Sequence, residues 1–194
     1  MPLEQPSTQW PLWAQAGTLH PDAGWHQPAW VFWTSAWLHG SSAHLSRNLM
    51  ALALLAVLGA SARMPPRAAL AWLLAWPLTQ MGMLQQALHT YIGLSGVLHA
   101  GFTVVALHHL THPIQMDRHQ RILGLILLAG LIFKILMENP WQHTLIRPAG
   151  SDINVAPWAH LSGAAAGAVV YLFTSVTTRA LSVKRLTRKQ RTLN

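Results

Sequence analysis

The stretch Gly93-Leu94-Ser95-Gly96-Val97-Leu98-His99 places a serine between two glycines at the start of an apolar run. A second polar-then-small start, His160-Leu161-Ser162-Gly163, opens a later apolar run. A serine and a histidine at the starts of two apolar helices suggest a protease that works inside a membrane.

Composition favours a bilayer as the solvent of this chain. The 194 residues are 52% hydrophobic and 9% charged, whereas about 25% of residues are charged in an ordinary soluble domain. The chain has no cysteine, which excludes disulfides and thiolate metal ligands. Its formal net charge of +8 comes from basic residues between apolar segments and in the tail from Arg179, which indicates membrane orientation and contact with anionic lipid rather than nucleic-acid binding.

Five segments are apolar enough to be membrane helices, each close to the length of about 20 residues that a span needs. We therefore predict an all-α, polytopic membrane helix bundle with three parts: a Trp-rich leader over 1–43, a membrane core over 44–177 and a basic tail over 178–194. The five segments are 45–62, 68–88, 93–109, 122–137 and 157–176.

The basic residues predict the orientation of the bundle. Arg63 and Arg67 follow the first span, Arg118 and Arg121 precede the fourth, and further basic residues follow the fifth, so all of them lie on one side by parity. Short cytoplasmic loops are rich in Lys and Arg. We therefore expect the N-terminus outside and the C-terminus in the cytoplasm, an orientation that corresponds to the inner (cytoplasmic) membrane in a bacterium.

The leader carries Trp30, Trp33 and Trp37 at helical spacing. Tryptophan favours the membrane interface, where one part of the indole is wet and the other is apolar. We expect 30–38 to lie on or dip into the outer leaflet, and a poorly ordered leader is the alternative.

Polar residues begin the odd-numbered spans: His44 and Asn48 the first, Ser95 the third and His160 the fifth. Odd-numbered spans run in the same direction, so these residues are expected at one depth near the outer face. His44 and Asn48 are four apart, which places both on one helix face. Polar groups in hydrocarbon are costly and are candidates for function.

Small residues predict that the third and fifth spans approach closely. Gly96 and Ala100 form a small stripe on one helix, and Gly163 and Gly167 form a Gly-x-x-x-Gly pattern on the other. Close packing here would bring the Ser95 hydroxyl near an imidazole able to activate it. The free amides at the start of the third span would favour a developing oxyanion.

The motifs His44-Leu-Ser-Arg-Asn48, Gly93-Leu-Ser-Gly96 and Ala159-His-Leu-Ser-Gly163 resemble those of rhomboid intramembrane serine proteases, over about 30–171. The resemblance implies a dyad without a third acid, in which Ser95 is the nucleophile and His160 the general base, with no cofactor or metal. It also implies an oxyanion hole of His44, Asn48 and the Ser95 amide, with Gly93 and Gly96 at the substrate site.

The longer motif from Gly93 to His99, with Lys134 and Glu138 in the fourth span, is similar to the rhombosortase branch. That likeness implies membrane-anchored substrates: exported proteins with a C-terminal sorting tail of a Gly-Gly-type motif, a hydrophobic helix and a basic end. His99 either contacts the dyad histidine or is a buried, satisfied histidine. Lys134 and Glu138 are four apart and are expected to neutralise one another.

Three other functions remain open. A catalytically inactive rhomboid-like protein that binds or chaperones transmembrane helices would share the same motifs. The pair His108 and His112 has the spacing for a metal site, although it lies at the cytoplasmic end without a carboxylate or cysteine partner. Lys134, Glu138 and Gln80 could form an ion path, but no inverted repeat is evident.

Overall fold

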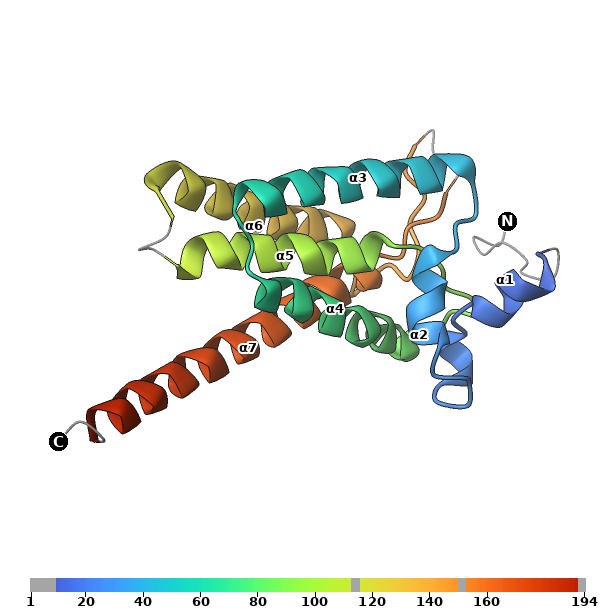
Figure 1. Cartoon of the computed structure of the whole chain (residues 1–194). Coiled ribbons are helices and arrows are strands. Elements are labelled where there is room, and N and C mark those ends of the chain that lie inside the picture. Colours follow the sequence, from blue (N-terminus) through green and yellow to red (C-terminus); the bar gives the residue numbers. More distant parts are fainter. Residues whose placement is uncertain (1–9, 113–115, 150–152, 192–194) are drawn as a thin grey trace.

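The computed structural model describes residues 10–112, 116–149 and 153–191, with side chains as far as residue 175. The described residues form helices and no strand, apart from two isolated bridges, Leu19 with Tyr91 and Ile146 with Val155 (Figure 1). The elements are α1 (Leu12–Gly17), η2 (Pro21–Ala23), α2 (Val31–Thr34), η3 (Ser35–Trp37), α3 (Ser42–Ser61), α4 (Pro66–Met81), η4 (Gly82–Gln85), α5 (Ser95–Thr111), α6 (Arg118–Glu138) and α7 (Pro157–Arg191).

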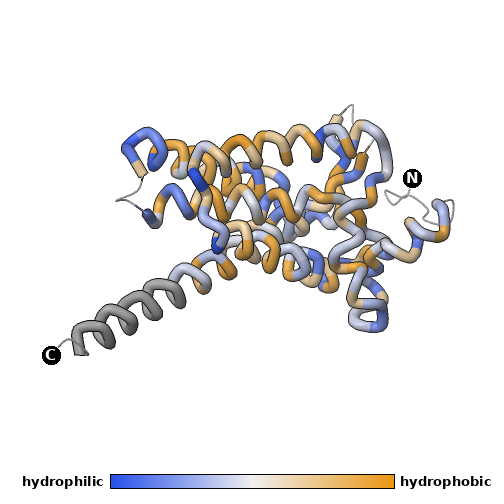
Figure 2. Tube along the Cα trace, viewed as in Figure 1, coloured by the Kyte–Doolittle hydropathy of each residue, from blue (hydrophilic) through white to orange (hydrophobic). Residues whose placement is uncertain are grey.

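The predicted all-α bundle is confirmed, and a long helix lies at each of the five apolar segments. Within the described residues, α3 and α6 meet the length and hydropathy expected of a membrane span, and few of their residues are buried inside the protein. Both helices expose many large apolar side chains, among them Leu54 on α3 and Phe133 on α6, and Figure 2 shows hydrophobic residues along α3. Helices α4 and α5 are slightly shorter, at 16 and 17 residues, so the total of five spans stays a prediction.

Helix α5 forms the centre of the bundle. It is buried along most of its length and packs against α3, α4, α6 and α7. Small residues make this possible on the α7 side, because a Cβ on Gly167 would lie 2.5 Å from the carbonyl oxygen of Ala100. The predicted close approach of the third and fifth segments is therefore confirmed.

The leader is an ordered part of the fold over the described residues 10–43. Leu19, Val31 and Phe32 are buried in a cluster with Met83 and Tyr91 from the segments before α5. The rings of Trp33 and Trp37 lie 5.7 Å and 5.3 Å from that of Trp76 on α4. The alternative of a poorly ordered leader is wrong for this part, and its position in the outer leaflet stays a prediction.

Two helix boundaries differ from the predicted segments. The second segment, predicted over 68–88, leaves the α-helix at Met81 and continues as the 3₁₀ turn η4. Gly82 begins that turn against α7, where a Cβ would lie 2.0 Å from the Ser162 hydroxyl oxygen. The fifth segment continues as helix into the predicted basic tail, as far as Arg191.

Candidate active site

Ser95 is the first residue of α5 and follows a sharp turn. Gly93 makes the turn with a φ of 122°, a conformation that L side chains rarely adopt. A Cβ on Gly93 would also lie 2.8 Å from Cε1 of His44, so the glycine admits the imidazole against the backbone. The turn places Ser95 at the N-terminal end of α5, beside the start of α3.

His160 lies in the first turn of α7 and is 3% exposed. Its Nε2 atom is 3.1 Å from the Ser95 hydroxyl oxygen, within hydrogen-bond distance. The close packing of α5 and α7 produces this contact, which the sequence predicted from the two stripes of small residues.

Glu138 also contacts His160. It is the last residue of α6, which ends when Asn139 adopts a left-handed conformation with a φ of 50°. Glu138 Oε2 lies 2.5 Å from His160 Nδ1, and Glu138 Oε1 contacts the ammonium of Lys134. The predicted Lys134–Glu138 pair is present, but the expectation that no acid lies beside His160 is wrong.

The partners of His160 determine its tautomer. A carboxylate can only accept hydrogen bonds, so the Nδ1–H of His160 donates to Glu138. Nε2 then carries a lone pair and accepts the hydrogen bond of the Ser95 hydroxyl. This is the arrangement in which an imidazole can remove a proton from a serine.

His99 covers one face of the His160 ring. The two rings are stacked, with centroids 4.0 Å apart and planes 13° from parallel. The Nδ1–H of His99 donates to the carbonyl oxygen of Ser95 at 2.7 Å, which orients the His99 ring. Of the two interpretations left open by the sequence, contact with His160 is therefore confirmed.

His44 and Asn48 lie on the first two turns of α3, which begins where the Ser41 hydroxyl accepts the amide N–H of His44. His44 lines the same cavity as Ser95. Asn48 is 5% exposed, and its side-chain nitrogen Nδ2 has no hydrogen-bond partner among the described residues. An amide donor of this kind is available to a substrate oxygen.

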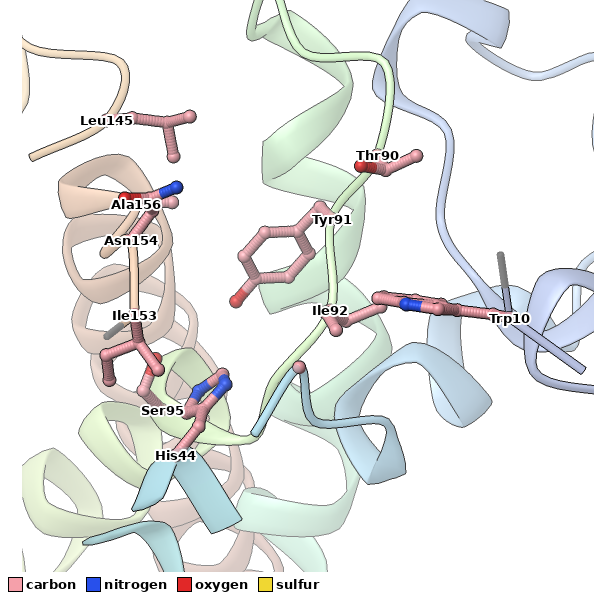
Figure 3. Close-up of a pocket in the computed structure, with 11 residues that line it drawn as sticks. Trp10, His44, Thr90, Tyr91, Ile92, Ser95, Leu145, Ile153, Asn154 and Ala156 are labelled. Atoms are coloured by element: carbon pink, nitrogen blue, oxygen red, sulfur yellow. The ribbon is translucent and has the colours of Figure 1, made fainter. Parts of the chain in front are cut away.

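The cavity beside Ser95 has a volume of about 90 Å³ (Figure 3). The Tyr91 ring points into it from the segment before α5, and the segment before α7 faces that ring. Burial raises the pKa of the Tyr91 phenol. The lining residues are Trp10, Gly40, His44, Thr90, Tyr91, Ile92, Ser95, Leu145, Ile153, Asn154 and Ala156.

Backbone hydrogen bonds from the leader hold the segment that carries Ser95. The Gly93 N–H donates to the Ser35 carbonyl oxygen at 2.9 Å, and Leu19 and Tyr91 exchange two hydrogen bonds as an isolated bridge. Sequence reasoning missed these contacts and Tyr91, because pairing of irregular backbone leaves no periodic pattern. The leader therefore has a direct structural connection to the site.

The histidines at the other end of α5 form a separate hydrogen-bonded group. The ring nitrogens of His108 and His112 lie 3.1 Å and 3.3 Å from the Tyr171 hydroxyl, and Arg67 contacts His112 Nε2 at 3.1 Å. Over the part of the chain that the structure describes, no three His, Cys, Asp or Glu side chains are arranged to hold a metal ion.

The structure thus brings Ser95, His99 and Glu138 into contact with His160 and places His44 at the cavity beside Ser95. The alternating direction of the apolar segments could have indicated Glu138. The fourth segment runs opposite to the third and fifth, so it ends on the side where they begin. Gly96, Gly163 and Gly167 serve the packing that supports the site rather than lining its cavity.

Comparison with known proteins identifies the family of the chain but not its individual site residues. A search of curated proteins and a search of solved structures each found no match. The family model described as the Rhomboid domain matches residues 26–176, a range that makes up most of the chain and includes Ser95, Glu138 and His160. The chain therefore belongs to the rhomboid family.

Proposed function

We propose that the protein is an intramembrane serine endopeptidase that uses Ser95 as nucleophile and His160 as general base. The observation that carries the proposal is the 3.1 Å contact between the Ser95 hydroxyl and His160 Nε2 at the start of two helices of an apolar bundle. Rhomboid proteins are generally intramembrane serine proteases, which supports the same reaction class.

The proposed reaction begins when the Ser95 oxygen attacks the carbonyl carbon of the scissile peptide and its proton passes to His160 Nε2. The tetrahedral intermediate collapses as the C–N bond breaks, and the same proton goes from Nε2 to the leaving amine. Water then attacks the ester, gives a proton to Nε2, and Ser95 recovers that proton when the acid leaves.

Negative charge on the carbonyl oxygen would be stabilised by the Ser95 amide and by donors from α3. The Ser95 amide lies at the N-terminus of α5, where helix amides are free to donate. His44 lines the cavity, and one turn further along the helix Asn48 has a buried Nδ2 donor with no partner in the part of the chain that the structure describes. Loss of one such donor typically costs about 10²–10³ in rate.

The proposed substrates are exported proteins with a C-terminal membrane tail, cut at or near that tail. The resemblance of the Gly93–His99 motif to the rhombosortase branch supports this class. The site would open to the outer face of a bacterial inner membrane, so that water and the exported part of a substrate reach it from the same side.

A fluorophosphonate serine probe tests the reaction class. We expect covalent labelling of the native chain in detergent or lipid discs, and loss of labelling in Ser95→Ala and His160→Ala. Ser61→Ala and His143→Ala are matched controls, because both side chains are exposed and lie away from the cavity. Both controls should label at the native rate.

Failure of the folded native chain to label would contradict the proposal. It would favour the alternative of a catalytically inactive rhomboid relative that binds transmembrane helices. Labelling that persists in Ser95→Ala would show that another hydroxyl reacts and would also contradict the assignment of Ser95.

A reporter cleavage assay tests the proposed substrate. The reporter would carry an exported domain, a Gly-Gly motif, one hydrophobic helix and a basic end, reconstituted in lipid with the native chain. We expect release of the domain, and little release from a matched reporter with Leu-Leu in place of Gly-Gly. Equal cleavage of both reporters would contradict the Gly-Gly preference while leaving the protease assignment intact.

A further inference from the structure

We propose that Glu138 is a positioning residue that fixes the tautomer and orientation of His160, so that the site operates as a Ser-His-Glu triad. The inference rests on the proposed function, which supplies the reaction that the triad would serve. It differs from the dyad without an acid that the sequence resemblance implied.

The first observation is the geometry of the carboxylate. Glu138 Oε2 lies 2.5 Å from His160 Nδ1, and the two side chains are 11% and 4% exposed. A short hydrogen bond between a carboxylate and an imidazole is stronger where little water competes with it. The contact therefore determines which nitrogen of His160 carries the proton.

The second observation is that Glu138 is itself held in place. Lys134, one helical turn earlier on α6, contacts Oε1 and leaves Oε2 for His160. The ammonium also supplies the opposite charge that favours an ionised carboxylate in an apolar setting. The sequence predicted that Lys134 and Glu138 only neutralise one another. In this proposal the pair also holds Glu138 in position against His160.

The third observation is that His160 is restrained on three sides. Ser95 lies at Nε2, Glu138 lies at Nδ1, and the His99 ring is stacked on one face at 4.0 Å. The restraints come from two helices, since Ser95 and His99 are on α5 and Glu138 is on α6. Together they specify the ring plane and its rotation.

The chemical consequence concerns charge rather than a second proton transfer. When Nε2 takes the Ser95 proton, His160 becomes an imidazolium with both nitrogens protonated. Glu138 continues to accept the Nδ1–H bond and stabilises that cation, while no proton passes to the carboxylate. The proton on Nε2 then goes to the leaving amine, and the triad returns to its starting state.

The test combines a direct measurement of the tautomer with the rate of probe labelling. The protein carries ¹⁵N-labelled histidine, and the His160 signals are identified by their absence in His160→Ala. In the native chain at neutral pH, we expect a protonated Nδ1 and an unprotonated Nε2. The Nε2-protonated tautomer in the native chain would overturn the proposal without any variant at Glu138.

Glu138→Gln is the decisive variant. Its amide can donate to an unprotonated Nδ1, which favours the Nε2–H tautomer that cannot accept the serine proton. We expect a shift of the His160 signals to that tautomer and a fall in the fluorophosphonate labelling rate of about 10²- to 10⁴-fold. The melting temperature should change little, because the amide still hydrogen-bonds the ring.

Asp117→Asn is the matched control, since it makes the same carboxylate-to-amide change at the N-cap of α6, where Asn is also a good cap. It should keep the native tautomer and rate. A Glu138→Gln chain with an unchanged tautomer and a rate within twofold of this control would overturn the proposal. A native chain with the expected tautomer but no labelling would instead refute the proposed function. The positioning of His160 by Glu138 would still be supported.

Discussion

Gly163 of α7 lies directly against the backbone of Gly96 of α5, where a Cβ on Gly163 would be 1.9 Å from the Gly96 carbonyl oxygen. No side chain fits between the two helices at this level. Ser95 directly precedes Gly96, and His160 lies three residues before Gly163. The distance between Ser95 and His160 is therefore determined by the contact between the two helix backbones. This relationship links a packing motif to the geometry of the candidate site.

Gly163→Ala should destabilise the protein and slow labelling of Ser95, because the added methyl group separates α5 from α7. Overpacking of this kind typically costs about 1–3 kcal/mol. Gly130→Ala on α6 is the control, since a Cβ there meets nothing within 4 Å. Thermal unfolding in detergent and the labelling rate would check both effects, and equal behaviour of the two variants would contradict the backbone contact.

Gly93→Ala should lower the labelling rate by more than its stability loss explains. The alanine must adopt a positive φ, and its Cβ would collide with the His44 ring beside Ser95. Gly24→Ala provides a matched comparison, because Gly24 also has a positive φ, 55°, but open space around its Cβ position. We expect Gly24→Ala to cost about 1–2 kcal/mol of strain at the native labelling rate. A similar rate loss in both variants would show that backbone strain alone is responsible.

His99→Leu should slow labelling by up to about tenfold, since stacked aromatic pairs are worth about 0.5–1.5 kcal/mol beyond their burial. His99→Phe keeps a flat ring and should recover most of the rate. His109→Leu is the control, because His109 is also buried on α5 and its Nδ1–H also donates to the carbonyl four residues earlier. A rate loss in His109→Leu as large as in His99→Leu would assign the effect to the helix rather than to the stack on His160.

Tyr91 should ionise at a pH above the usual value of about 10 for a tyrosine phenol. Burial favours the neutral phenol, which raises its pKa in the folded protein. Between about pH 10 and that raised pKa, the unfolded chain releases the phenol proton and the folded chain keeps it, so folding stability falls as pH rises.

The ultraviolet absorbance of tyrosinate measures this titration. The chain has two tyrosines, so Tyr171→Phe leaves Tyr91 as the sole phenol. We expect its transition near pH 10 in denaturant and at higher pH in the folded state. A folded-state transition at the denatured value would contradict the burial of Tyr91 beside Ser95.

The predicted orientation can be tested with single cysteines, because the native chain has none. His143→Cys lies in the loop between α6 and α7, and His119→Cys lies at the start of α6; both positions are exposed. In intact cells, a membrane-impermeant maleimide should label position 143 and reach position 119 only after lysis. The reverse pattern would contradict the orientation inferred from the arginines.

Much of the fold could be predicted because the relevant signals are local. Apolar length gave the long helices, and the small residues Gly96, Gly163 and Gly167 gave the close contact of α5 with α7. Helix direction placed Ser95 and His160 at the same end of the bundle. The physical reason is that each helix carries its own pattern of hydrophobicity and side-chain size. That pattern limits whether the helix can lie in a membrane and how closely another helix can pack against it.

Only the tertiary structure decided how individual side chains are partnered. The spacing of Lys134 and Glu138 indicated an ion pair, yet the second carboxylate oxygen contacts His160, which the rotation of α6 about its axis brings within reach. The leader contacts to Gly93 and Tyr91 depend on irregular backbone, whose hydrogen bonds have no sequence period. The sequence by itself thus determined the bundle and placed the serine near the histidine, whereas the contact of Glu138 with His160 joins separate helices and no local pattern specifies it.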